Sequence, residues 1–138
     1  MAGVLVDTGI LYALADIDDA WHESVKEFLQ TITETLVVPV TVVPEVCYLL
    51  NTHLGQESER KLIASIIHGE LRIEGLTNDD FRRSFQFLET YSDMNIGFVD
   101  ASVVAIAERL KIHRLLTTDR KHFSIIRPRH CPAFELLP

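Results

Sequence analysis

Four acidic side chains stand beside apolar segments of this 138-residue chain, and their types suggest a cation site. They are Asp7, Glu45, Asp100 and Asp119. Converging carboxylates repel one another, and burying an ionised carboxylate is costly unless a cation accompanies it. Hard oxygen ligands, with no histidine or cysteine cluster at ligand spacing, favour Mg²⁺ or Mn²⁺ over zinc. Such an ion activates a bound water or polarises a phosphoryl oxygen, so the chemistry that fits is phosphodiester hydrolysis.

Each of these acids also has a plainer explanation when it is considered alone. Asp100 is suited to cap the N-terminus of a helix, and Glu45 suits the first turn of one, where the helix dipole favours an acid. Asp7 and Asp119 are equally suited to caps or turns. Considered together, four acids at comparable points beside apolar segments favour a common site.

Short apolar runs alternate with helical patterns along the chain. Strands are predicted over residues 4–6, 36–38, 71–73 and 114–117, with an edge strand over 134–137. Helices are predicted over residues 10–15, 20–32, 41–54, 58–68, 77–88 and 101–110, and residues 91–98 are predicted to form a loop. This alternation predicts an α/β fold whose mostly parallel sheet of about five strands is covered on both faces.

The predicted sheet suggests where the acids meet. Asp7 ends the first strand and Asp119 follows the fourth, so neighbouring parallel strands, about 4.8 Å apart, would release both at the same edge. Ligands of such sheets bind outside the carboxyl ends of the strands, where the strand order reverses. Asp100 stands directly before the helix 101–110, and Glu45 follows Pro44 in a first helical turn. Both can be aimed at that edge.

Composition limits the class of protein. The apolar fraction of 47% suits one domain over residues 1–138, and no membrane span or export signal is evident, so we expect a cytoplasmic protein with Cys47 and Cys131 as free thiols. The net charge of −7 argues against a nucleic-acid partner. However, residues 109–138 hold seven Lys/Arg and two Asp/Glu, which forms a local basic patch or simply a solvated face.

Four stretches resemble the motifs of PIN-domain ribonucleases, in an order and spacing similar to VapC-type toxins of bacterial toxin–antitoxin pairs. They are "VLVDTGILYALAD", "VVPEVCYLL", "GFVDASVVAIAERL" and "LLTTDRKHF". The resemblance covers essentially the whole chain. It implies a PIN-like three-layer α/β/α sandwich and an endoribonuclease that depends on Mg²⁺, with Mn²⁺ as the other suitable ion. It also implies a protein antitoxin and a second copy of this chain, as a homodimer, as partners.

The resemblance also implies roles for individual residues. Asp7 and Asp100 take the best-supported metal-ligand positions, and Glu45 and Asp119 complete the catalytic quartet, with Asp119 also at the metal. The accessory positions are Thr8 and Thr118, whose hydroxyls line the site, and Asp93, which is an acid near the pocket or a plain loop residue. Arg120, Lys121 and His122 would draw the RNA backbone toward the metal, with Arg127 and Arg129 extending the track.

One residue departs from the family pattern, one alternative function stays open, and a second is set aside. Gly9 stands where many relatives carry a serine or asparagine, so a supporting hydrogen bond is in doubt. One alternative is a non-catalytic module that keeps the fold and binds RNA or protein. The other, a haloacid-dehalogenase-like phosphatase, needs a second acid two residues after Asp7, and Gly9 occupies that position.

Overall fold

The computed structural model describes residues 3–138, and in this range five strands form one parallel sheet. The strands are β1 (Gly3–Val6), β2 (Thr35–Pro39), β3 (Arg72–Glu74), β4 (Arg114–Leu116) and β5 (Glu135–Leu137). Their order is β3-β2-β1-β4-β5, and every pair is parallel. The predicted parallel sheet of about five strands is therefore confirmed.

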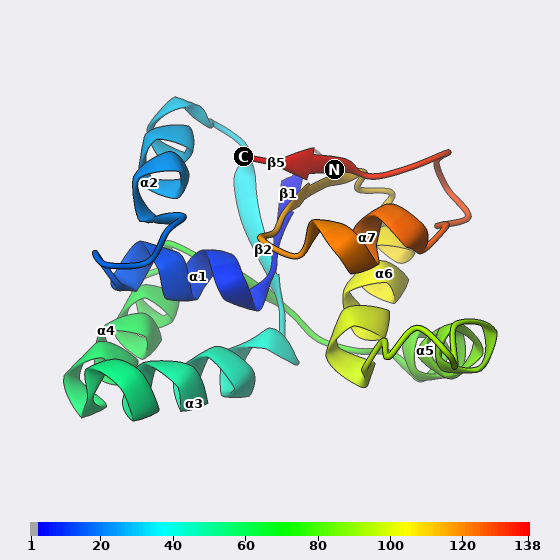
Figure 1. Cartoon of the computed structure of the whole chain (residues 1–138), viewed down its shortest axis with the longest axis horizontal. Coiled ribbons are helices and arrows are strands. Elements are labelled where there is room, and N and C mark those ends of the chain that lie inside the picture. The colour runs from blue at the N-terminus through cyan, green and yellow to red at the C-terminus, as the bar shows by residue number, and fades with distance from the viewer. Residues whose placement is uncertain (1–2) are drawn as a thin grey trace.

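Helices cover both faces of the sheet, which confirms the predicted three-layer α/β/α arrangement (Figure 1). On one side lie α1 (Thr8–Ala15), α2 (His22–Thr31), α3 (Val42–Leu54) and α4 (Gln56–Ile67). On the other side lie α5 (Asn78–Thr90), α6 (Phe98–Leu110) and α7 (Arg120–Ile125). None of the helices in residues 3–138 combines the length and apolarity needed to cross a membrane.

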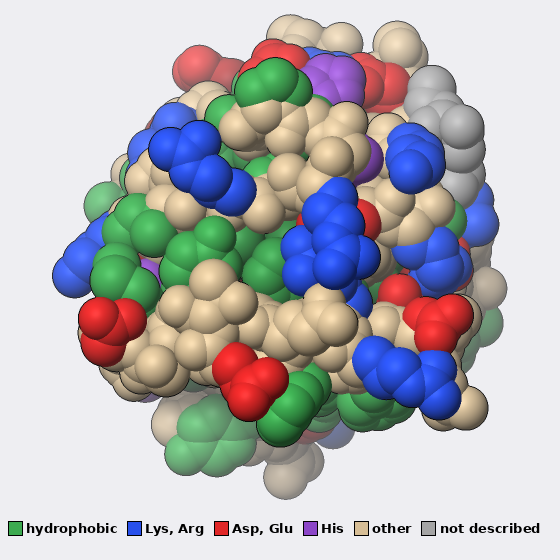
Figure 2. Space-filling model, turned by 90° about the vertical axis from the view of Figure 1, so that its right-hand side faces the viewer, with side chains coloured by type: hydrophobic (Ala, Val, Ile, Leu, Met, Phe, Trp, Pro, Cys, Tyr) green, Lys and Arg blue, Asp and Glu red, His purple; other side chains and the backbone are tan. Residues whose placement is uncertain are grey.

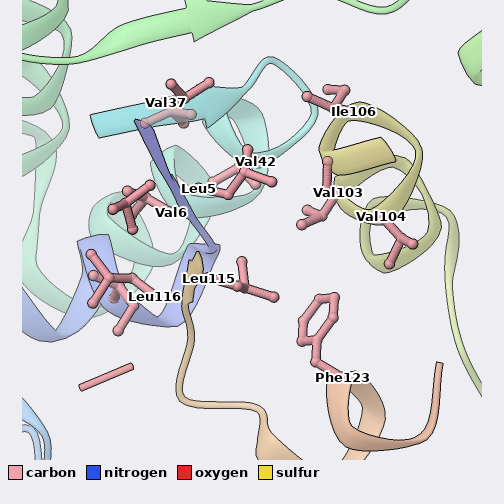
Figure 3. Packing of buried hydrophobic residues seen from close by; sticks show 14 of the residues in the cluster. Leu5, Val6, Val37, Val42, Val103, Val104, Ile106, Leu115, Leu116 and Phe123 are labelled. Atoms are coloured by element: carbon pink, nitrogen blue, oxygen red, sulfur yellow. The ribbon is translucent and has the colours of Figure 1, made fainter. Parts of the chain in front are cut away.

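The central strands are buried on both faces because their side chains alternate between the two helical layers. Figure 3 shows Leu5 and Leu115 directed toward α6 and α7, whereas Val6 and Leu116 point to the opposite side. All four side chains are at most 1% exposed. Burial of this kind contributes about 1.5–3 kcal/mol for each large aliphatic side chain, and it holds the ends of β1 and β4 in fixed register.

β1 is the central strand, and the sheet extends from it on both sides. β2 and β3 extend it on one side, and β4 and β5 on the other, with Leu5 opposite Leu115 and Val6 opposite Leu116. The strand order therefore reverses beside β1, and Asp7 and Asp119 leave the sheet at this switch point. The prediction that their two strands are parallel neighbours is confirmed.

The prediction differs from the structure mainly around the last two helices. The chain turns into α7 immediately after Asp119, whereas no helix was predicted there, because six residues are too few to show a helical period. Helix α6 begins at Phe98 instead of Ala101. The predicted cap of α5 is present, since Thr77 and Asp80 form a reciprocal capping box. Cys47 and Cys131 are both free thiols.

Candidate metal centre

Asp7 sits at the junction of β1 and α1 with its carboxylate held by the neighbouring strand. It is the N-cap residue of α1 but makes no side-chain capping hydrogen bond to that helix. Instead Oδ2 accepts a hydrogen bond from Oγ1 of Thr117 at 3.0 Å, and the residue is only 7% exposed. The backbone N–H of Asp7 donates to the carbonyl of Leu116 at 3.0 Å. The carboxylate is therefore fixed at the sheet edge and not used as a cap.

Glu45 reaches the same region from the first turn of α3. Its Oε1 accepts a hydrogen bond from the hydroxyl of Thr8, the residue after Asp7. Glu45 itself is exposed, whereas Thr8 is buried. This bond links α1 to α3 and holds the Glu45 carboxylate beside Asp7.

Asp100 approaches from α6, and its position corrects one prediction. It does not stand before the helix but is the third residue in it, and the N-cap residue is Gly97. Its carboxylate is therefore free to face the cluster, where Oδ2 lies 3.7 Å from Nδ1 of His122. A separate hydrogen bond of 2.6 Å between the hydroxyls of Thr41 and Ser102 joins α6 to the segment before α3.

Asp119 both caps a helix and faces the other acids. Its Oδ1 accepts from the backbone N–H of His122 at 3.0 Å, which caps α7. Its Oδ2 lies 2.8 Å from Nδ1 of the same His122. The backbone N–H of Asp119 donates to Oγ1 of Thr117 at 2.9 Å. Asp119 is thus a helix cap, as its plainer explanation has it, and it also belongs to the acidic cluster.

The four carboxylates act on one another electrostatically. Burial raises the pKa of Asp7 to about 6, and the negative charges of Glu45 and Asp119 add to this rise. Burial also raises the pKa of Asp100 to about 6, and the charges of Asp7, Asp119 and Glu45 raise it further, while His122 lowers it. Clustered negative charge of this kind is unfavourable without a counter-ion.

The donor atoms present suit a divalent cation. Ligand atoms of Asp100, Asp119 and His122 lie within 4.8 Å of one another. The set is dominated by carboxylate oxygens, which hard divalent cations prefer. A bound cation would also offset the repulsion that raises the pKa of Asp7 and Asp100.

The predicted accessory residues differ in how they relate to the four acids. Thr8 holds Glu45, as described, and Thr118 directly precedes Asp119 and lies against Gly9. Asp93 is exposed in the connection between α5 and α6. Within residues 3–138, no hydrogen bond or ion pair joins Asp93 to the four acids.

The three basic residues after Asp119 point in different directions. His122 turns to the acids. The Arg120 guanidinium lies 3.5 Å from the carbonyl of Leu136, also contacts the carbonyl of Pro138, and stands over the Trp21 ring at 5.6 Å. Lys121 is exposed. Lys and Arg side chains are scattered over the α5–α7 side of the molecule, with acidic and hydrophobic groups among them (Figure 2).

Two residues of the cluster were not singled out for these positions from the sequence. Thr117 bridges Asp7 and Asp119, whereas only its neighbour Thr118 was predicted to line the site. His122 was assigned to RNA binding, and the structure places its ring against two carboxylates. The sequence carries no signal that separates Thr117 from Thr118, because a shift of one residue at a strand end reverses which side chain faces Asp7.

Comparison with known proteins gives the same family as the motifs. Residues 4–127 match the PIN domain model. The chain is 30% identical to "Ribonuclease VapC26" of Mycobacterium tuberculosis, over 98% of this chain and 100% of that protein. The crystal structure of M. tuberculosis VapC20, described as a sarcin–ricin loop cleaving toxin, has a TM-score of 0.80 at 24% identity, covering 86% and 91% of the two chains. A toxin–antitoxin complex from Klebsiella pneumoniae has a TM-score of 0.69 at 20% identity, covering 89% and 92%. This chain therefore belongs to the PIN domain family.

Proposed function

We propose that this protein is a metal-dependent endoribonuclease and the toxin of a toxin–antitoxin pair. The observation that carries the proposal is the gathering of Asp7, Glu45, Asp100 and Asp119 beside the switch point of a parallel sheet. The relatives support the same activity, because one is named a ribonuclease and another a 23S rRNA-specific endonuclease. We further propose that residues 1–138 form one PIN-like domain that acts in the cytoplasm.

In this proposal Asp7, Asp100 and Asp119 hold Mg²⁺, for which Mn²⁺ can substitute. When bound, such an ion lowers the pKa of a coordinated water and neutralises charge that develops on the phosphoryl oxygens. The raised pKa of Asp7 and Asp100 supports this assignment, since a cation is what the clustered carboxylates lack.

Glu45 is proposed to orient the attacking water and to accept its proton. It is the exposed member of the quartet, and the hydroxyl of Thr8 fixes one of its oxygens. Water attacks phosphorus in line with the leaving oxygen, the phosphorus–oxygen bond of the RNA backbone breaks, and the leaving oxygen takes a proton from solvent. Thr118 and Asp93 are proposed as accessory groups at the rim. Arg120 and Lys121, with His122 nearby, are proposed to attract the RNA phosphates.

The test is cleavage of a synthetic looped RNA by the purified protein with Mg²⁺, with Mn²⁺, or with excess EDTA. We expect metal-dependent cleavage that disappears in Asp7→Asn. A matched control is Asp18→Asn, which changes an exposed aspartate in the turn after α1 and is expected to cleave normally. If the wild-type protein binds RNA but cleaves none with either metal, a non-catalytic PIN-fold module is the better description.

We also propose a protein antitoxin and a second copy of the chain as partners. The relatives include a structure described as a toxin–antitoxin complex. Apolar side chains of α1, α3 and α4, together with Leu36 and Leu71, line a groove of about 340 Å³ that suits the apolar face of an amphipathic antitoxin helix. Co-purification with the product of an adjacent small reading frame, weakened by Leu14→Lys in this groove, tests the first partner. Sedimentation equilibrium tests the second.

A further inference from the structure

We propose that His122 binds the metal directly through Nδ1, and that this nitrogen makes the site prefer Mn²⁺ to Mg²⁺. The inference rests on the proposed function, because it concerns the same site. It adds a nitrogen to a ligand set that the sequence predicts to consist of oxygens alone.

The spacing of the donor atoms supports shared ligation. Nδ1 of His122 lies 2.8 Å from Oδ2 of Asp119 and 3.7 Å from Oδ2 of Asp100. In octahedral coordination with bonds of about 2.1 Å, neighbouring donor atoms lie about 3.0 Å apart and opposite ones about 4.2 Å apart. The 2.8 Å separation is close to that of neighbouring ligands, and the 3.7 Å separation lies between the two values, below the largest distance that two ligands of one ion can span.

The backbone holds the imidazole in this position from two directions. The N–H of His122 is bound by Oδ1 of Asp119, and the next side chain, Phe123, is 1% exposed in the core. Figure 3 shows Phe123 directed from α7 toward Leu115 and Val103. Because Phe123 anchors α7 and Asp119 caps it, the ring of His122 is presented to the acids before any ligand binds.

The neutral imidazole has a tautomer that can bind a metal through Nδ1. Its two nitrogens are exchangeable as donor and acceptor, so the proton can reside on Nε2 while Nδ1 offers its lone pair. The side chain of His122 is 21% exposed, which leaves room for that proton to meet water. Mg²⁺ strongly prefers oxygen ligands, whereas divalent transition ions accept imidazole. A site that adds one imidazole to its carboxylates therefore shifts its preference toward Mn²⁺.

The experiment measures metal binding in the full chain and does not depend on cleavage. Mn²⁺ is titrated into the wild-type protein, His122→Gln and His113→Gln. Free Mn²⁺ is followed by electron paramagnetic resonance, and electron spin echo modulation reports nitrogen bound to the ion. His113 is the matched control, because it is exposed and its nearest recorded charge is Glu135 at 3.9 Å.

We expect ¹⁴N modulation in the wild type and His113→Gln, and none in His122→Gln. Since losing a group that merely orients a ligand costs about 10–100-fold in metal affinity, we expect Mn²⁺ affinity to fall at least about tenfold in His122→Gln. Mg²⁺ affinity, measured by competition, should fall less, so the ratio of the two affinities changes. A merely structural role would lower both affinities together.

Mn²⁺ bound to the wild type without ¹⁴N modulation overturns the proposal and leaves His122 as a residue that positions Asp119. This result needs no variant and so does not depend on whether His122→Gln folds. RNA cleavage by the same preparation would show that the proposed function survives this failure. Absence of both Mn²⁺ binding and cleavage would overturn the proposed function as well.

Discussion

A Cβ atom added to Gly9 would lie only 2.2 Å from Oγ1 of Thr118, so the threonine side chain occupies the space that any other residue at position 9 needs. Gly9 follows Asp7 by two residues, and Thr118 directly precedes Asp119. The two segments that carry these acids are thus packed against each other at the sheet edge. From the sequence, Gly9 was interpreted as the loss of a hydrogen-bond donor. In the structure, the Thr118 hydroxyl occupies the space of the missing side chain.

This packing predicts that Gly9→Ala destabilises the protein by about 1–3 kcal/mol, the usual cost of overpacking a well-filled interior. Thr118→Ala removes the atom at 2.2 Å and leaves Cβ at 3.3 Å, so Gly9→Ala should cost less in that background. Urea unfolding of the two single variants and the double variant measures the coupling. Gly75→Ala is the control, because an added Cβ there meets nothing within 4 Å. Equal costs in both backgrounds would contradict the contact.

The raised pKa of Asp7 predicts how stability of the metal-free protein depends on pH. Its pKa is about 6 in the folded protein and 3.8 when unperturbed, so the folded state binds the proton more tightly. The stabilisation from this proton is complete below about pH 4 and is lost as pH rises through 6. We therefore expect Asp7→Asn to be more stable than the wild type well above pH 6, by about 3 kcal/mol, and not below pH 4.

Thermal unfolding of both proteins in EDTA between pH 4 and 8 tests this expectation. The difference between them isolates position 7 together with its repulsion of Asp100, because all other side chains are the same in both proteins. Asp18→Asn, which alters an exposed carboxylate, should show the pH dependence of the wild type. A stability difference between Asp7→Asn and wild type that does not vary with pH would contradict the expectation.

A divalent cation should reverse the same penalty. A ligand that binds only the folded state stabilises it by about 2.7 kcal/mol at a hundred times its Kd. We expect Mg²⁺ or Mn²⁺ to raise the Tm of the wild type at pH 7.5, and to raise it much less in Asp7→Asn or Asp100→Asn. Differential scanning calorimetry across a metal titration measures this. An identical rise in wild type and both variants would indicate binding elsewhere on the acidic surface.

The position of Asp100 inside α6 predicts that it does not cap the helix. Gly97 is the N-cap residue, so Asp100→Asn should not lower the Tm of the metal-free protein. Thr77→Ala provides the contrast, because the Thr77 hydroxyl accepts a hydrogen bond from the backbone N–H of Asp80 at 3.1 Å. We expect this substitution to lower the free energy of unfolding by about 1 kcal/mol. A Tm that falls as far in Asp100→Asn as in Thr77→Ala would show that Asp100 stabilises the helix end.

The sequence was sufficient for the features that depend on strands and long helices. Asp7 and Asp119 could be placed together because alternating strands and helices predict a parallel sheet, whose strand ends meet at one edge. His122 could not be placed, because its position depends on α7, a helix of six residues capped by Asp119 and anchored by Phe123. Thr117 and Thr118 could not be told apart, since a shift of one residue at a strand end reverses which side chain faces Asp7.

Among the basic residues that follow Asp119, Lys121 and Arg127 are the best able to contact RNA phosphates, because the side chains of Arg120 and Arg129 contact other groups of the chain. Both are exposed, and within residues 3–138 neither has a carboxylate at ion-pair distance, whereas Arg109 is bound by Glu74 and Asp80. Each phosphate contact to single-stranded nucleic acid contributes about 0.7 to the slope of log K against log salt. We therefore expect Lys121→Gln and Arg127→Gln each to reduce the magnitude of that slope by about 0.7, measured by fluorescence anisotropy in the Asp7→Asn background, which we expect not to degrade the RNA.

Lys26→Gln is the control for this salt dependence, because Lys26 is equally exposed but lies on α2, on the other side of the sheet (Figure 1). It should leave the slope unchanged. If all three variants change the slope equally, the protein attracts RNA only through its overall charge. If none changes it, the basic residues after Asp119 are a solvated face, and affinity must come from the metal and the groups around it.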